Sequence, residues 1–224
     1  MQIIQTSDPT PAIQALSDRL IQELSQNKKV LWFVSGGSNI GAAVKIMANI
    51  GDDLSKNLIV TTIDERFGPV GHPDSNWQQL QDAGFAPKQA TLIPPLQPEE
   101  TLETAAARFR DQLAQAFASC DISIALLGMG PDGHISGILP NSVATDLQND
   151  IVVGYVSDPY ERITTTFTAL AKISVFYLFA YGENKREQLL ALRDQTLDYD
   201  TQPAQFLKEM PEVYVYNDQI GEAA

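Results

Sequence analysis

The residues with the clearest chemical potential are His134 and Asp132, which lie in the glycine-rich segment Gly128–His134 (GMGPDGH). A histidine can accept a proton near neutral pH, and a nearby carboxylate can hold its other ring nitrogen in one tautomer. The three glycines allow the backbone to turn sharply and to approach a ligand closely. Because positioned histidine–carboxylate pairs cluster at functional sites, the segment predicts a site of proton transfer. The competing interpretation is a tight turn with a surface histidine.

Two other enzyme motifs fit this segment poorly. The spacing of Gly128, Gly130 and Gly133 formally matches the dinucleotide fingerprint, whose last glycine belongs to the start of a long helix. Here Pro140 follows closely, and a proline interrupts a helix. The Gly-x-Ser-x-Gly sequence of a serine nucleophile elbow occurs nowhere in the chain. The segment therefore favours histidine chemistry, with a nucleotide-binding domain as an alternative.

A second glycine-rich segment follows the apolar run Val30–Val34 and contains Gly36, Gly37 and Ser38. Ser38 is a suitable N-cap for a helix predicted over 40–50. A helix N-terminus offers free N–H groups and the positive end of the helix dipole, which together bind anions. The segment therefore predicts an anion site, and a plain strand-to-helix turn is the alternative.

Charged residues follow other strands of the predicted fold. Asp64 and Arg66 come directly after the apolar run 58–63, and Arg162 lies after another predicted strand. Lys185 falls in the first turn of a predicted helix, where a cation is unfavourable and indicates an anion nearby. For Arg162 and Lys185, spacing alone favours simple solvation at the surface.

Composition limits the classes of function. The chain of 224 residues is 44% hydrophobic, which suits one domain with a substantial core. Its net charge of −13 argues against a nucleic-acid partner, while a small anion needs only a few cations. One cysteine and two histidines provide neither an intrachain disulfide nor a familiar zinc pattern. Without a signal peptide or a membrane-spanning run, we predict a cytoplasmic monomer or small homo-oligomer with no membrane partner.

The hydrophobic pattern alternates between strands and helices. Strands are predicted over 3–4, 30–34, 58–63, 91–93, 122–127, 151–156, 173–180 and 212–216. Helices are predicted over 10–26, 40–50, 77–83, 99–119 and 181–193, with a short one from 202. This alternation predicts that residues 1–224 form a single α/β domain, with a Rossmann-like, mostly parallel sheet and helices on both faces. The carboxyl ends of its strands would bring the candidate residues to one crevice.

Several segments together resemble the 6-phosphogluconolactonase family, which shares its fold with glucosamine-6-phosphate deaminase. The matching segments are 35–38 (SGGS), 64–66 (DER) with 73–76 (PDSN), 128–134 (GMGPDGH) and 161–164 (ERIT). A weaker match is 182–185 (GENK). The resemblance extends over about residues 30–190, and its third segment is highly specific.

The resemblance implies hydrolysis of 6-phospho-D-glucono-1,5-lactone, a step of the pentose phosphate pathway, without a metal or cofactor. His134 would be the general base that activates water, and Asp132 would orient it. Arg66, or backbone amides of the glycine-rich turn, would stabilise the oxyanion. The phosphorylated sugar lactone would be bound by Gly36, Gly37, Ser38, Asp64, Gly130, Gly133, Arg162 and Lys185. A single sugar-phosphate lactonase/isomerase-like domain is the organisation that follows.

The chain departs from the family pattern after the histidine, where the lactonase sequence Thr-Ala-Ser-Leu-Phe-Pro is replaced by Ile135–Pro140 (ISGILP). The corresponding deaminase sequence is His-Ile-Ala-Phe-Asn-Glu-Pro, and Ile135 matches its isoleucine. Leu139, however, stands at the position of the deaminase glutamate. Arg66 is lactonase-like, since deaminases usually have tyrosine there. The lactonase is therefore preferred, and a deaminase/isomerase-like enzyme or a non-catalytic sugar-phosphate-binding protein are the alternatives.

Overall fold

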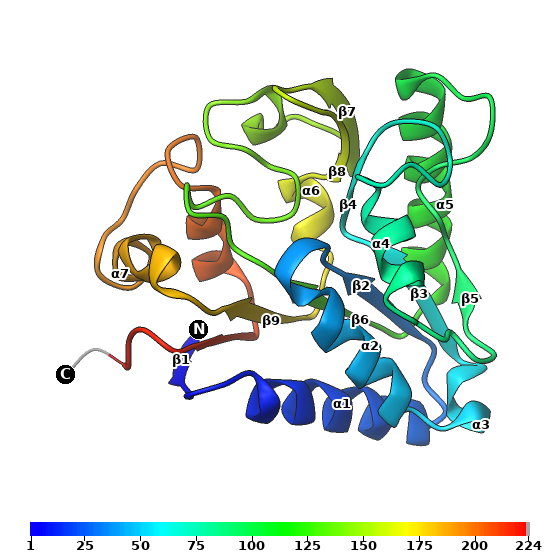
Figure 1. The fold of residues 1–224 in the computed structure, drawn as a ribbon, viewed down its shortest axis with the longest axis horizontal. Coiled ribbons are helices and arrows are strands. Elements are labelled where there is room, and N and C mark those ends of the chain that lie inside the picture. Colours follow the sequence, from blue (N-terminus) through cyan, green and yellow to red (C-terminus); the bar gives the residue numbers. More distant parts are fainter. Residues whose placement is uncertain (223–224) are drawn as a thin grey trace.

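Continuous apolar runs form the central strands, as expected for strands that are covered on both faces. In the computed structural model, which describes residues 1–222, β2 (Val30–Val34) and β9 (Val175–Ala180) are buried throughout. β6 (Ile122–Leu127) lies between them and is buried after its first residue. These three strands form the middle of a seven-stranded sheet (Figure 1).

The order of the strands is that of a doubly wound sheet. From β2 the chain proceeds to one edge through β3 (Leu58–Thr62) and β5 (Thr91–Leu92). It then proceeds to the other side of β2 through β6, β9 and β10 (Val213–Asn217), with β1 (Gln2–Gln5) at that edge. Every pairing is parallel, which confirms the predicted parallel sheet. Its direction reverses between β2 and β6, and sheets of this kind bind ligands beyond the strand ends at that reversal.

Helices cover both faces of the sheet, as predicted. On one face, α1 (Thr10–Ser25) and α2 (Ile40–Asn49) pack against a cluster that includes Trp32 of β2. On the other face, α5 (Leu102–Ser119) and α7 (Arg186–Asp194) share a cluster with Phe33. Three shorter helices are α3 (Asp52–Ser55), α4 (Asn76–Asp82) and α6 (Phe167–Leu170). Within the described residues, no helix combines the length and the apolar character needed to cross a membrane.

A second, three-stranded sheet was not anticipated by the sequence. β4 (Asp64–Arg66), β8 (Glu161–Thr165) and β7 (Val152–Val156) pair antiparallel in that order. The sequence analysis predicts no strand over 64–66 or 161–165, but antiparallel pairing satisfies the backbone polar groups of both segments despite their charged side chains. The backbone N–H and Oγ1 of Thr165 both donate to the carbonyl of Ile63, at 3.1 and 2.9 Å, which ties this small sheet to the end of β3.

Two helix starts also differ from the expectation. Ser38 is not an N-cap, since residues 37–39 form a 3₁₀ turn and α2 begins after Asn39. The amide of Asn39 instead donates to the carbonyl of Leu127, 3.0 Å away, and so links the ends of β2 and β6. The helix expected from residue 181 begins as a 3₁₀ turn over Glu183–Lys185, and α7 follows it.

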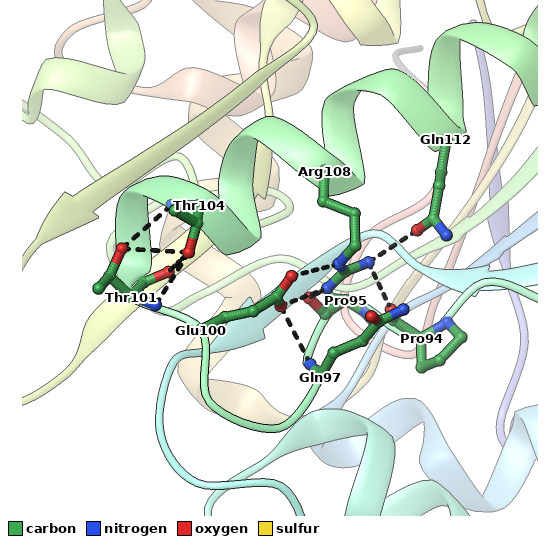
Figure 2. Close-up of polar contacts among 8 residues, drawn as sticks. All are labelled: Pro94, Pro95, Gln97, Glu100, Thr101, Thr104, Arg108 and Gln112. Atoms are coloured by element: carbon green, nitrogen blue, oxygen red, sulfur yellow. Dashed lines mark hydrogen bonds and ion pairs between the residues drawn. The ribbon is translucent and has the colours of Figure 1, made fainter.

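α5 supports the small sheet, and its first turns are held by a cluster of polar contacts (Figure 2). Arg108 makes two bonds to the Glu100 carboxylate, at 2.6 and 2.8 Å, and donates to the carbonyl of Pro95. Thr101 and Thr104 form a capping box, which satisfies free N–H groups at the helix start. The buried side of α5 packs on β7 and β8, and therefore fixes the layer that carries Arg162.

Candidate active site

A cavity of about 210 Å³ lies beyond the carboxyl ends of β2 and β6, at the reversal of the sheet. It is bordered by the loop after β2, by β4 and β8 of the small sheet, and by the segment after β6. Asp132 does not line the cavity itself but contacts the lining residue His134, and Gly133 lies in the turn between these two residues. The other predicted site residues all line the cavity: Gly36, Gly37, Ser38, Asp64, Arg66, Gly130, His134, Arg162 and Lys185.

His134 and Asp132 form the pair that their spacing predicts. Nδ1 of the histidine lies 2.7 Å from Oδ1 of the aspartate, which also accepts the backbone N–H of His134 at 3.3 Å. Burial acts to raise the pKa of Asp132, but its hydrogen bond and charge interaction with His134 outweigh burial and lower this pKa. An ionised carboxylate has no proton to donate, so in the neutral imidazole Nδ1 carries the proton and Nε2 keeps a free lone pair. This is the arrangement of a general base.

The turn that presents His134 is closed by its own backbone. The N–H of Gly130 donates to the carbonyl of His134 at 2.9 Å, and Met129 and Ile135 form an antiparallel bridge. No helix follows this turn, which removes the structural context of a dinucleotide fingerprint. A methyl group on Gly130 would overlap Nδ1 of His134 and Oδ1 of Asp132. The glycine therefore allows the side chains of His134 and Asp132 to lie against the backbone.

Two arginines lie side by side in the small sheet. Arg66 of β4 and Arg162 of β8 are paired directly across the strands. Both guanidinium groups lie over the ring of Tyr160, at 4.7 and 5.7 Å from its centroid. Among the described residues, neither arginine forms an ion pair within 4.0 Å. Like charges directly opposite each other are unfavourable, so an anionic ligand would stabilise this pair.

Lys185 adds a third cation to the same cavity. Burial lowers the pKa of its amine, and the charge of Asp132 partly opposes that shift. Within residues 1–222 this amine forms no ion pair within 4.0 Å, and a partly buried ammonium group is stabilised when an anion binds beside it. The predicted anion site thus has three cations, although it does not have the direct helix start that was expected after Ser38.

Asp64 lines the cavity and is almost completely buried. Burial raises the pKa of its carboxyl group, and the charges of Arg162, His134 and Arg66 oppose that shift. The amide of Asn76 donates to both its carbonyl and its carboxylate, at 3.1 and 3.3 Å. Asn76 was missed as a site residue, although its segment was among those that matched the family.

Asn76 also explains a glycine in the anion loop. Its side-chain amide lies where a methyl group on Gly36 would be, so any larger residue there would displace it. Both residues line the cavity, and they join the loop after β2 to the start of α4. The close approach of these two segments depends on a glycine at position 36.

Glu65 is fully buried and binds the first residues of α4. Its carboxylate accepts the backbone N–H groups of Arg66, Asn76 and Trp77, at 2.8, 2.6 and 2.9 Å. It also accepts the hydroxyl of Ser75 at 3.1 Å. Burial raises the pKa of Glu65 to about 7, even though these N–H groups act to lower it. One carboxylate therefore positions the backbone of two cavity residues, Arg66 and Asn76.

The raised pKa of Glu65 predicts a pH-dependent contribution to stability. The group titrates at about 7 in the folded chain against an ordinary value of 4.5. Its contribution is therefore fully present below pH 4.5 and is lost as the pH rises through 7, because only the folded chain retains the proton. In urea unfolding, the difference in unfolding free energy between wild type and Glu65→Gln should shrink by about 3 kcal/mol over this range. A difference that stays constant from pH 4 to 8 would contradict the assignment.

Besides Asn76, Ser136 also lines the cavity, and the sequence analysis did not single it out.

The described residues contain no group of three or more His, Cys, Asp or Glu side chains that could hold a metal ion.

Comparison with known proteins places these features in one family. Residues 8–215 match the family model of glucosamine-6-phosphate isomerases/6-phosphogluconolactonase. The 6-phosphogluconolactonase of Pseudomonas aeruginosa is 31% identical over 193 residues, which cover 80% of this chain and 79% of that protein. The corresponding protein of Rhizobium meliloti is 30% identical over 197 residues, covering 81% of this chain and 83% of its own length.

Solved structures share the fold over nearly the whole chain. A 6-phosphogluconolactonase from Shewanella baltica has a TM-score of 0.78 at 21% identity, with 97% of each chain covered. A monomeric glucosamine-6-phosphate deaminase has a TM-score of 0.79 at 20% identity, also with 97% of each chain covered. Both enzyme types thus share this architecture, and the distinction between them depends on the residues in the cavity.

Proposed function

This chain belongs to the glucosamine-6-phosphate isomerase/6-phosphogluconolactonase family, and we propose that it hydrolyses 6-phosphogluconolactone to 6-phosphogluconate. The observation that carries the proposal is the His134–Asp132 pair beside three cations, Arg66, Arg162 and Lys185, none of which forms an ion pair within 4.0 Å in the described part of the chain. This combination suits a substrate that is an anion and reacts with water. The relatives from Pseudomonas aeruginosa and Rhizobium meliloti, whose match extends over most of their length, are lactonases.

In the proposed reaction, Nε2 of His134 takes a proton from a water molecule as the water oxygen attacks the lactone carbonyl. The carbonyl oxygen becomes an oxyanion in the tetrahedral intermediate, which Arg66 or backbone amides of the glycine-rich turn stabilise. When the intermediate collapses, the bond between the carbonyl carbon and the ring oxygen breaks. The protonated His134 returns its proton to that ring oxygen, and Asp132 stabilises the imidazolium in between.

The phosphate of the substrate is assigned to the cationic side of the cavity. We propose that Arg162 and Lys185 bind it together with the loop Gly36–Ser38. Asp64 and Gly130 complete the binding surface, and Gly133 contributes through the turn that carries His134. The proposed steps use only backbone and side-chain groups of this chain, without a metal or cofactor. The cytoplasmic location, the single domain over 1–224 and a monomeric or small homo-oligomeric state stay predictions of the sequence.

The test is a direct assay of lactone hydrolysis. The lactone is generated fresh from glucose 6-phosphate, and its spontaneous opening is measured with and without the protein. Acceleration proportional to protein concentration supports the proposal, and no acceleration contradicts it. Ammonia release from glucosamine 6-phosphate is measured in parallel for the runner-up activity. We expect none, because Leu139 stands at the position of the deaminase glutamate and does not line the cavity.

A further inference from the structure

Ser136 has a backbone conformation that a serine rarely adopts. Its φ angle is 53°, in the left-handed region that favours glycine. It lies two residues after His134, in a tight loop where Ile135 bridges to both Met129 and Ile138. Such a conformation raises the free energy of the folded chain. It is kept only where the surrounding structure holds the backbone in place, which is common at ligand-binding sites.

The side chain of Ser136 has a second unfavourable feature. The residue lines the cavity but is only 8% exposed, and its Oγ is buried without a hydrogen-bond partner among the described residues. A buried hydroxyl that lacks a partner loses its bonds to water and gains nothing in return. A glycine at position 136 would avoid both the strained φ angle and the unpaired hydroxyl. The free protein is therefore less stable with serine than with glycine.

The loop around Ser136 is held firmly by its neighbours. The N–H of Gly137 donates to Oγ1 of Thr164 at 2.9 Å, and the hydroxyl of Tyr155 donates to the carbonyl of Gly137 at 2.5 Å. Both partners belong to the small sheet, β8 and β7. The backbone of Ser136 is thus fixed relative to the cavity, and rotation about its Cα–Cβ bond is the remaining freedom of the hydroxyl.

We propose that Ser136 is a substrate-binding residue whose hydroxyl forms a hydrogen bond with a hydroxyl group of the bound sugar. This inference rests on the proposed function, since a sugar lactone supplies hydroxyl groups that both donate and accept hydrogen bonds. A ligand in the cavity draws the Ser136 hydroxyl into the staggered position that faces it. The sugar provides the hydrogen-bond partner that the hydroxyl lacks in the free protein. The free energy of this bond therefore increases the affinity for the substrate.

Two substitutions test this role, Ser136→Ala and Ser136→Gly. Both remove the hydroxyl, so we expect KM to rise about tenfold, the equivalent of about 1.4 kcal/mol, with a smaller change in kcat. The affinity for the product, 6-phosphogluconate, measured by calorimetry, should fall by a similar factor. Ser136→Gly should also raise the thermal midpoint by about 2–4 °C, because it removes the strained φ angle and the unpaired hydroxyl.

Asn27→Gly is the matched control for the backbone effect. Asn27 also has a positive φ angle, of 59°, but lies at the end of α1 outside the cavity, so this variant should leave KM unchanged. A KM within twofold of wild type in both Ser136 variants would overturn the proposal, as would a lower thermal midpoint for Ser136→Gly. Because the wild type is assayed first, absence of any lactonase activity would instead contradict the proposed function.

Discussion

Replacement of His134 by alanine should lower kcat for lactone hydrolysis by about 10²–10⁴-fold, the usual contribution of a general base. The structure gives the reason, since Asp132 holds Nδ1 at 2.7 Å and leaves Nε2 free beside the cavity. KM should change little, because the cations Arg66, Arg162 and Lys185 remain. The measurement is initial velocity against lactone concentration, after subtraction of the spontaneous reaction.

The other histidine of the chain provides the control for this experiment. His72 lies in the loop before α4, and its Nε2 is 2.9 Å from the carbonyl of Arg66. His72→Gln removes the second imidazole but keeps a polar group there, so we expect most activity to remain. If His134→Ala retained wild-type kcat, water would be activated by another group and the proposed mechanism would be wrong. The proposed lactonase function would survive that result.

Gly130→Ala should reduce kcat by about 10²-fold or more, even though it adds a single methyl group. That group would overlap Nδ1 of His134 and Oδ1 of Asp132, so one or both side chains must move. A displacement of about 1 Å is enough to cost about 10²-fold in rate. The pair is partly exposed, so it can move without disrupting the core, and the thermal midpoint should fall only slightly. Kinetics and thermal unfolding of the same preparation separate the two effects.

Gly41→Ala is the matched control for Gly130→Ala. Gly41 lies in α2, and a methyl group there would have no atom within 4 Å outside its own helix. Alanine is the better helix former, by about 0.5–1 kcal/mol, so this variant should be fully active and slightly more stable. Equal activity of Gly130→Ala and Gly41→Ala would show that the close approach at Gly130 has no role in catalysis.

The sequence predicts the main sheet well, because a buried parallel strand is a continuous apolar run that local composition reveals. β2, β6 and β9 are such runs, and each lies within two residues of its expected bounds. The small sheet is different, since β4 consists of Asp64–Arg66 and has no apolar pattern. β4 becomes a strand because it pairs with β8, which is distant in sequence, and the local residue pattern does not predict that pairing.

The same distinction applies to the cavity. His134, Asp132 and the glycines are recognisable, because their residue types and short spacing suit proton transfer and sharp turns. Asn76 and Ser136 have ordinary residue types, and Asn76 is tied to the cavity by its contact with Asp64, twelve residues earlier in the chain. Ser38 was predicted to be the N-cap of α2, but it lies inside the 3₁₀ turn over residues 37–39, and α2 begins after Asn39. Helix ends are set by such local contacts, and patterns place them less well than helix centres.

The pairing of β4 with β8 also has a consequence for the order of folding. β4 has only three residues and lies at the edge of a three-stranded sheet, so few backbone hydrogen bonds hold it in place. We therefore expect the small sheet to form after the main sheet and to open before it. A chain with this sheet open would retain most of its core but would lose the face-to-face arrangement of Arg66 and Arg162. The rate of inactivation under mild denaturation would then follow local opening, which amide hydrogen exchange in β4 and β8 reports, rather than global unfolding.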